Sequence, residues 1–360
     1  MKYFFASRIG IIGAGAIIGT IAALLQYAGN PANMGICVAC FLRDIAGALG
    51  LHRAGVVQYL RPEIIGMFGG AFIAALLFKD FRPSGGSSPI VRFFLGMLAM
   101  FGALVFLGCP WRAVLRLAGG DANALFGIIG LVAGISIGIF FLTRGYSLGK
   151  KQPLSKKAGW LLPVFWGVLL LLLIFQVKPL ETGALFFSAS GPGSLHPAVW
   201  LSLLAGLAIG IIAQRSRFCS VGAIRDAVLV KDFHLFSGLL AFLGAALVWN
   251  LLLGQFRLGF EGQPIAHTDS LWNALGMVLA GMAFVLAGGC PGRQVFLSGE
   301  GDMDAAVFVM GMLVGAGLAH NFGVAASPGG VTLAGQVTVI LGIIICLILG
   351  FTNLRGGETR

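Results

Sequence analysis

Long apolar stretches recur along the whole chain, and they constrain its fold more than any other feature of the sequence. About twenty consecutive apolar residues cross the hydrocarbon core of a bilayer as one α-helix. Helices are expected there because lipid offers the backbone N–H and C=O groups no other partner. With 58% hydrophobic and only 10% charged residues, the composition excludes an ordinary water-soluble fold. We therefore predict an all-α polytopic membrane protein.

Ten stretches are long and apolar enough to be candidate spans. Many of the 56 glycines fall inside them, where small residues let helix backbones approach closely. The predicted spans are residues 8–28, 58–78, 90–107, 122–142, 159–177, 197–214, 236–254, 271–288, 303–321 and 334–352.

The Lys and Arg residues are shared unevenly between the two sides of this predicted topology. About 17 of the 24 lie on the side that holds both chain termini, and an excess of positive charge is typical of cytoplasmic loops. We therefore expect both termini in the cytoplasm. The most basic stretch is RGYSLGKKQPLSKK, residues 144–157, which we interpret as a topogenic, lipid-facing cluster. The formal net charge of +11 thus indicates a lipid bilayer and no nucleic-acid partner.

Three motifs occur twice at nearly the same offset. The stretch GCPWR at 108–112 recurs as GCPGR at 289–293, and the dipeptide Gly-Asp at 120–121 recurs at 301–302, both 181 residues later. A repeated offset of this kind indicates an internal repeat, so we predict a first membrane repeat over 1–178 and a second over 179–360. The third motif recurs 182 residues later, with Cys37, Arg43 and Asp44 matched by Cys219, Arg225 and Asp226.

The ten predicted spans give about five spans to each repeat. Because five is odd, the two repeats are predicted to enter the membrane from opposite sides. Such inverted-topology repeats are typical of transporters, which bind substrate near the midplane at the repeat interface. On this topology, Cys37 and Cys109 approach from outside, whereas Cys219 and Cys290 approach from the cytoplasm. The four cysteines would then line one axis.

The two GCP motifs also predict helix starts, because proline is favoured at the first helical position. Gly119-Gly120 and Gly299 end the helices that follow, which leaves about nine residues each, too few to cross a bilayer. We interpret them as re-entrant half-helices. Their N-termini attract anions, and Arg112 and Arg293 add full positive charge in the first turn.

The repeated positions of four cysteines favour a functional role for them over simple packing. A neutral thiol is a soft, weak S–H donor and weak acceptor, which suits a polarisable sulfur or selenium atom. Cys37 and Cys40 also form a CxxC pair that is typical of redox or metal sites. However, Gly222 stands where a second Cys40 would be expected, and Cys346 is alone in the last span.

The charged residues near these motifs allow two interpretations. Arg43 and Asp44 are adjacent, as are Arg225 and Asp226, so on a helix they point about 100° apart and need not pair with each other. Because charges inside a membrane face partners or cavities, they serve either as structural ion pairs or as guides for an anion. Glu63 follows Pro62 and is expected to start a helix, and we predict no metal ligands among the five His.

The paired motifs CxxxxxRD and GCPxR in two halves of a Gly-rich membrane chain resemble the YeeE/YedE sulfur-transport family. The stretches NPANMGICVACFLRDIAGALGLHRA, FLGCPWRAVLRLAGGD and LAGGCPGRQVFLSGEGD resemble more narrowly its selenium-metabolism branch, YedE. The resemblance implies a multi-pass protein of the bacterial inner membrane with an hourglass-like interior. It also implies a substrate path along Cys37, Cys109, Cys219 and Cys290.

By this resemblance, the chain would import a small sulfur- or selenium-containing anion, such as thiosulfate, by relay between thiols. A cytoplasmic carrier protein of the TusA type would be a partner, and no cofactor or enzymatic activity is expected. The alternative from the enzyme class is a membrane thiol oxidoreductase that uses Cys37 and Cys40. A third reading, an aquaporin-like pore, rests on a single Asn-Pro-Ala at 30–32 that the second half does not repeat.

Overall fold

The computed structural model describes residue 5 and residues 7–175 and 185–354, and almost all regular structure in them is helical. Two short strands, β1 (Ser84–Gly85) and β2 (Gln152–Pro153), form one antiparallel pair. The predicted all-α fold class is confirmed. The helices are α2 (Arg8–Tyr27), α3 (Val38–Ala48), α4 (Pro62–Leu77), α5 (Pro89–Val105), α6 (Pro110–Ala118), α7 (Asn123–Thr143), α8 (Lys156–Gly159), α9 (Leu161–Ile174), the 3₁₀ turn η1 (Pro192–Ser194), α10 (Val199–Ser216), α11 (Ser220–Leu229), α12 (His234–Leu252), α13 (Ser270–Ala287), α14 (Pro291–Gly299), α15 (Met303–Asn321) and α16 (Leu333–Thr352).

Within the described residues, nine helical segments are long and apolar enough to cross a membrane. The predicted span at 58–78 is too long, because α4 begins only at Pro62 and has 16 residues. Proline fixes the first helical position there, so residues 58–61 precede the helix. Glu63 lies in its first turn, as predicted.

The long helices pack in pairs that the sequence offset relates to one another. Helix α7 packs on α13 and α15 packs on α5, while α4 packs on α10 and α2 packs on α12. A shift of 181 residues moves α5 onto α13 and α7 onto α15, so it converts the α7–α13 pair into the α15–α5 pair. The helix pairs cross at glycines. An added Cβ at Gly134 would lie 2.2 Å from the carbonyl oxygen of Val278, so this crossing depends on a residue without a side chain.

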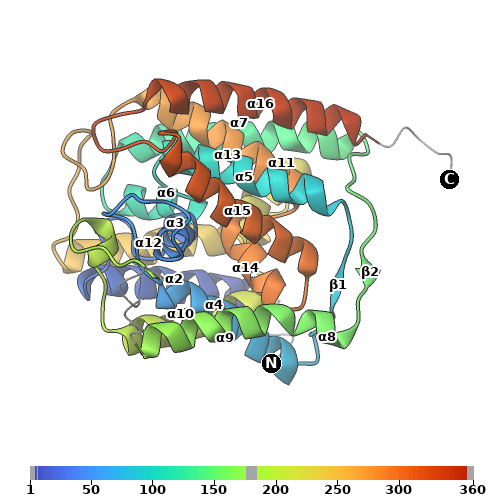
Figure 1. Cartoon of the computed structure of the whole chain (residues 1–360). Helices are drawn as coiled ribbons and strands as arrows, with labels where there is room; N and C mark the ends of the chain where they lie inside the picture. Colours follow the sequence, from blue (N-terminus) through green and yellow to red (C-terminus); the bar gives the residue numbers. More distant parts are fainter. Residues whose placement is uncertain (1–4, 6, 176–184, 355–360) are drawn as a thin grey trace.

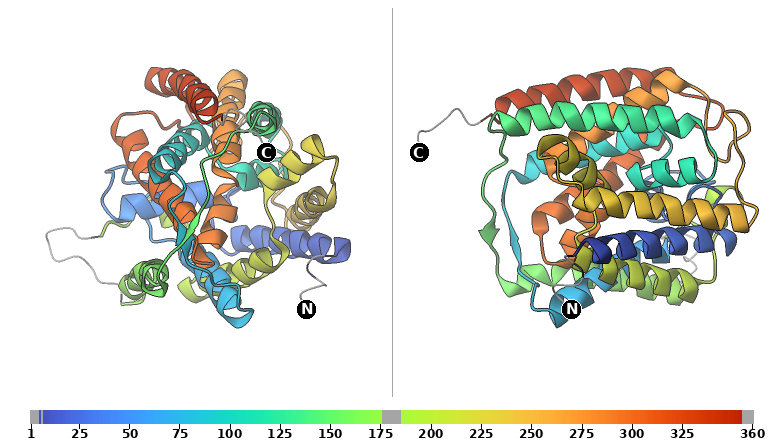
Figure 2. Two further views of the ribbon diagram at one scale, coloured as in Figure 1. Left: turned by 90° about the vertical axis from the view of Figure 1, so that its right-hand side faces the viewer. Right: turned by 180° about the vertical axis from the view of Figure 1, so that it is seen from behind.

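The short helices α6 and α14 lie inside a ring of longer helices (Figures 1 and 2). Their C-terminal ends reach opposite ends of the molecule, because Gly120 packs against Arg257 whereas Gly301 packs against Pro83. The structure therefore bears out the predicted helix ends, with α6 stopping at Ala118 and α14 at Gly299.

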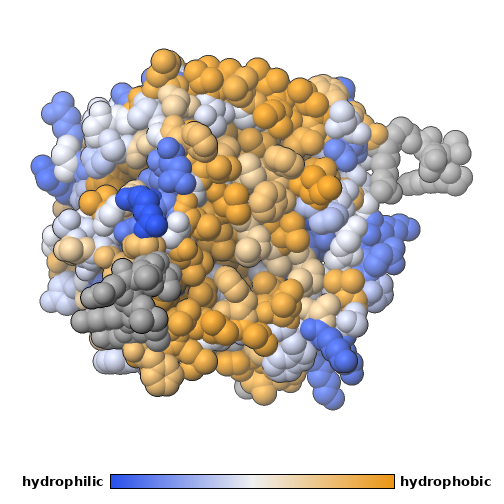
Figure 3. Space-filling view, viewed as in Figure 1, coloured by the Kyte–Doolittle hydropathy of each residue, from blue (hydrophilic) through white to orange (hydrophobic). Residues whose placement is uncertain are grey.

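Apolar residues cover the middle of the molecular surface, and hydrophilic residues gather where the helices end (Figure 3). At one end, β2 of the basic stretch pairs with β1. Lys151 forms an ion pair with Asp302, and Arg215 forms another with Asp80 at 2.7 Å. Several of the predicted basic segments thus meet at this end of the molecule. An apolar belt between two polar ends fits a membrane-spanning chain.

Candidate functional site

The N-termini of the two half-helices meet in the interior of the molecule. Cys109 and Cys290 are the N-cap residues of α6 and α14, and a proline follows each at the first helical position. An added Cβ at Gly292 of α14 would lie 3.3 Å from the Trp111 ring of α6. Two helix starts, each with free N–H groups and partial positive charge, therefore face one interior region.

Three cysteines of the first half form what we call the first thiol cluster: Cys37, Cys40 and Cys109. The Cys37 Sγ lies 2.7 Å from the Cys40 Sγ and 3.8 Å from the Cys109 Sγ. Cys37 is the N-cap of α3, and its sulfur accepts a hydrogen bond from the backbone N–H of Cys40 at 3.3 Å. All three are free thiols, at most 1% exposed.

Two cysteines of the second half form the second thiol cluster, in which the Cys219 Sγ lies 3.6 Å from the Cys290 Sγ. Cys219 is the N-cap of α11 and accepts from the N–H of Gly222 at 3.2 Å, while Cys290 accepts from the N–H of Arg293 at 3.5 Å. The structure thus brings the four predicted cysteines together as two pairs, one from each half.

Comparison of the two halves did not predict Cys40 as a member of the site. Gly222 occupies the matching position in the second half, so the repeat does not point to Cys40, yet its sulfur lies in the first thiol cluster. The signal was local, since residues three apart in the first turn of a helix are neighbours. Cys346 is buried in α16 and contacts neither cluster among the hydrogen bonds of the described residues.

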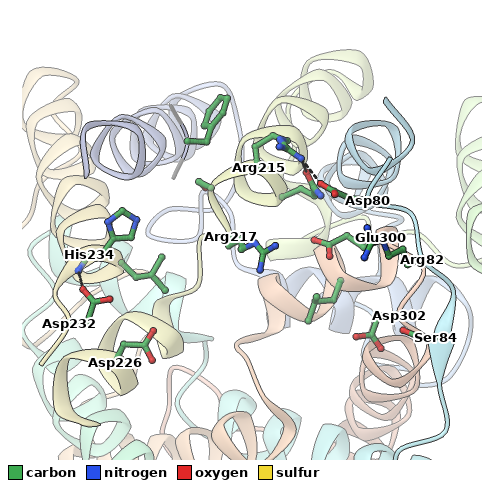
Figure 4. Close-up of a pocket in the computed structure, with 15 residues that line it drawn as sticks. Asp80, Arg82, Ser84, Arg215, Arg217, Asp226, Asp232, His234, Glu300 and Asp302 are labelled. Atoms are coloured by element: carbon green, nitrogen blue, oxygen red, sulfur yellow. Dashed lines mark hydrogen bonds and ion pairs between the residues drawn. The ribbon is translucent and has the colours of Figure 1, made fainter. Parts of the chain in front are cut away.

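A cavity of about 850 Å³, which we call the vestibule, lies at the end of the molecule where Ser84 and Asp302 meet. Its wall carries both signs of charge (Figure 4). Arg217 and Leu235 also line a second, inner cavity of about 210 Å³ that reaches Cys219. The charged residues of the vestibule wall are Asp80, Arg82, Arg215, Arg217, Asp226, Asp232, Glu300 and Asp302.

Arginine side chains line the inner cavity. Its lining includes Arg217, Arg225 and Arg293 but no Asp or Glu among the residues that the structure describes. It contains Cys219, whose side chain is 6% exposed. Three arginines therefore line the space that joins the vestibule to the second thiol cluster, and such a lining attracts anions.

The adjacent Arg-Asp residues pair with each other in both halves, although they are only one residue apart. Arg43 lies 2.7 Å from Asp44, and this pair is buried; Arg225 lies 2.8 Å from Asp226, and this pair is partly exposed. The long arginine side chain reaches back to its neighbour. Asp44 also accepts from Arg61 at 2.7 Å, a buried arginine that belongs to none of the repeated motifs.

Arg112 differs from these paired arginines. Its guanidinium is fully buried and donates to the carbonyl oxygens of Asn33 at 3.2 Å, Ile265 at 3.0 Å and Leu107. It lies 3.8 Å from the Cys40 Sγ, and it forms no ion pair with any Asp or Glu of the described residues. A buried charge without a countercharge is unfavourable unless a ligand supplies one, so the first thiol cluster is suited to an anion.

The other half-helix arginines have carboxylate partners. Arg293 lies 3.3 Å from Glu300, and Arg116 lies 2.6 Å from Asp121 within the buried end of α6. Burial raises the pKa of the Glu300 carboxyl, although the Arg293 charge opposes this rise. Arg116 was not predicted, but its partner Asp121 belongs to the repeated Gly-Asp motif, which was the available signal.

The fold and this interior define a class: a multi-pass membrane protein with two short interior helices and two buried thiol clusters. A sequence model described as "Sulphur transport" matches residues 215–349, a region that includes the second thiol cluster. The chain is similar to a thiosulfate transporter, TsuA, of Spirochaeta thermophila, with 35% identity over 29% of this chain and 31% of TsuA. It is 32% identical to TsuA of Escherichia coli over 28% of each chain.

A longer match joins the chain to the protein named "Probable transporter YedE" of Escherichia coli, at 24% identity over 70% of this chain and 62% of that protein. The chain spans less than a third of the length of either TsuA in these matches. Together they confirm the resemblance to the YeeE/YedE sulfur-transport family that the cysteine and arginine motifs carry.

Proposed function

We propose that this chain is a membrane transporter, or channel-like protein, that imports a small sulfur- or selenium-containing anion. The observation that carries the proposal is the pair of buried thiol clusters at facing helix N-termini, one of which is reached through an arginine-lined cavity. The names of the similar proteins, a thiosulfate transporter and a probable transporter, support the same class of function.

The chemistry of the site supports a relay between thiols. Neutral S–H groups donate weak hydrogen bonds to a polarisable sulfur or selenium atom, and the backbone N–H groups at the helix starts favour its negative charge. Conduction is favoured by several weak sites in series over one tight site. In this proposal, Cys219 and Cys290 form one site, and Cys37 and Cys109 form the other.

The proposal includes the two inverted repeats, 1–178 and 179–360. Support comes from the related helix pairs and from half-helices whose outer ends reach opposite ends of the molecule. It further places the chain in the bacterial inner membrane, with both termini and the vestibule on the cytoplasmic side, since the basic stretch 144–157 contacts the rim of the vestibule through Lys151 and Asp302. A TusA-like carrier would then receive the anion at this rim.

Uptake into membrane vesicles tests the relay. We expect Cys109→Ala and Cys290→Ala each to abolish uptake of the transported anion while the protein still inserts. Cys346→Ala is the matched control, because it removes an equally buried thiol outside both clusters. Labelled thiosulfate, selenite and selenosulfate are compared in one assay to identify the anion. Wild-type rates in both cluster variants for every transported anion would refute the relay.

A second candidate is a membrane thiol oxidoreductase, and the 2.7 Å separation of the Cys37 and Cys40 sulfurs favours considering it. It predicts that these two thiols form a disulfide whose level changes with turnover. Acid trapping of the thiols in membranes, followed by mass spectrometry, measures that level. Full uptake in a Cys40→Ala variant, with no disulfide in the native protein, would eliminate this candidate.

A further inference from the structure

Trp111 lies where the starts of the two half-helices meet. It follows Cys109 by two residues in the first turn of α6, and its side chain is 1% exposed. Its ring centroid lies 5.6 Å from that of Phe218, the residue that precedes Cys219, and 6.2 Å from that of Phe296 on α14. The indole therefore bridges the helix start of the first cluster and the residues that hold the second.

The second half supplies the room for this ring. The residue at the repeat position of Trp111 is Gly292, which follows Cys290 by two residues. An added Cβ at Gly292 would lie 3.3 Å and 3.4 Å from two carbon atoms of the indole, Cζ2 and Cε2, a separation at the tight limit of van der Waals contact. One half thus brings a large ring to the junction of the half-helices, and the other brings no side chain.

The polar end of this ring has no partner. The indole Nε1–H of Trp111 is buried and makes no hydrogen bond with any described residue, and its ring neighbours are the aromatic side chains of Phe218, Phe242 and Phe296. A buried donor without an acceptor costs about 1–3 kcal/mol, and buried Trp N–H groups usually find a partner. The unpaired donor at this junction indicates a transient acceptor, and an anion oxygen is the acceptor that the adjacent sites would deliver.

We propose that Trp111 is the gate of the pathway. Its ring separates the two thiol clusters in the structure described here, and its Nε1–H hydrogen-bonds an oxygen of the anion as the ring moves aside. This inference rests on the proposed function for the identity of the anion, but the barrier itself is a property of the ring. The barrier can therefore be tested without measuring transport.

Thiol labelling tests the barrier. Membrane vesicles of each orientation are treated with the membrane-impermeant reagent sulfonatoethyl methanethiosulfonate, and the modification of each cysteine is measured by mass spectrometry. The orientation in which Cys219 reacts defines the vestibule face. From that face, we expect Cys109 to be protected in the native protein and in Trp111→Phe, and to react at least tenfold faster in Trp111→Ala. Equal protection of Cys109 in a Trp111→Ala protein whose Cys219 reacts normally would overturn the gate.

Uptake kinetics test the donor and the fit separately. Trp111→Phe keeps a ring but loses the N–H, so we expect a KM for uptake several-fold higher with little change in the maximal rate. Gly292→Val presses on the indole and should slow uptake at least tenfold, and Trp111→Phe in the Gly292→Val background should restore part of that loss. If the double variant is as slow as Gly292→Val alone and Trp111→Phe leaves KM unchanged, Trp111 only packs. If uptake is lost in all variants but the labelling pattern is as expected, the proposed identity of the transported anion is wrong, and the barrier formed by Trp111 still stands.

Discussion

The buried charge of Arg112 gives the most direct test of anion binding at the first thiol cluster. Among the arginines of the two half-helices, it is the one without a carboxylate partner in the described part of the chain. We expect Arg112→Met to raise the KM for uptake strongly, because methionine keeps much of the side-chain length and removes the charge. Arg112→Lys should keep KM near the native value, because it preserves the charge and loses only the planar fork.

The structure sets the scale of this effect. The guanidinium lies 3.8 Å from the Cys40 Sγ, so an anion held by the thiols would be centred roughly 6 Å from the charge. At an effective dielectric constant of about 20, two unit charges at that separation attract by roughly 3 kcal/mol. Since about 1.4 kcal/mol corresponds to a factor of ten, the upper limit for the loss is about a hundredfold, and we expect a tenfold to hundredfold rise in KM.

The assay compares concentration-dependent uptake in proteoliposomes with thermal unfolding of the same purified variants. Both substitutions disturb the hydrogen bonds that Arg112 gives to the carbonyl oxygens of Asn33, Leu107 and Ile265, so both should lower the melting temperature. Arg293→Met is the matched control in the second half, where Glu300 already balances the charge, and its KM should change less. Equal KM values for Arg112→Met and the native protein, or equal damage by Met and Lys, would refute the electrostatic argument.

Three further predictions concern pH and assembly. Because burial raises the pKa of Glu300 above its ordinary value, acidification protonates Glu300 at a higher pH than an exposed Glu and frees Arg293, so the rate of uptake should increase as pH falls. Glu300→Gln should give the high rate of uptake at every pH. A Glu300→Gln protein that keeps the native pH profile would contradict this prediction. Arg61→Leu should destabilise the protein by about 2–3 kcal/mol, seen as a lower melting temperature in detergent, because Asp44 keeps its pair with Arg43 but loses a buried, charged hydrogen-bond partner. Gly134→Val should prevent close packing of α7 on α13 and reduce the yield of folded protein, whereas Gly13→Val, with no atom within 4 Å of an added Cβ, should express normally.

Local chemistry explains why much of the interior could be predicted from the sequence. Proline at the first helical position and glycine near the last act within a few residues, so the starts of α6 and α14 at Pro110 and Pro291 and their approximate ends were readable. The predicted span at 58–78 was too long because hydropathy ignores such signals. Its apolar residues continue upstream of Pro62, but the helix does not.

Contacts that long side chains make across the fold could not be predicted from the sequence in the same way. Arg61 reaches Asp44, Asn30 and two backbone carbonyls of the segment after residue 185, yet the matching position in the second half is Leu243, so no repeat drew attention to it. The pairing of Arg43 with Asp44 was one of two alternatives that the sequence left open, because backbone directions alone omit the reach of a flexible arginine. Repeats reveal what the halves share, whereas Arg61, Cys40 and Trp111 are features of one half.

These differences between the halves decide which end of the pathway is open. Cys219 lines a cavity, whereas Cys37 and Cys40 are fully buried. The closed end is held by the network of Arg43, Asp44 and Arg61, whose exposed fractions are 3%, 0% and 0%, while the matching pair Arg225 and Asp226 is 34% and 22% exposed and lacks a third member among the ion pairs of the described residues. On the proposed function, passage of an anion through both clusters would require the Arg61 network to loosen as well as Trp111 to move.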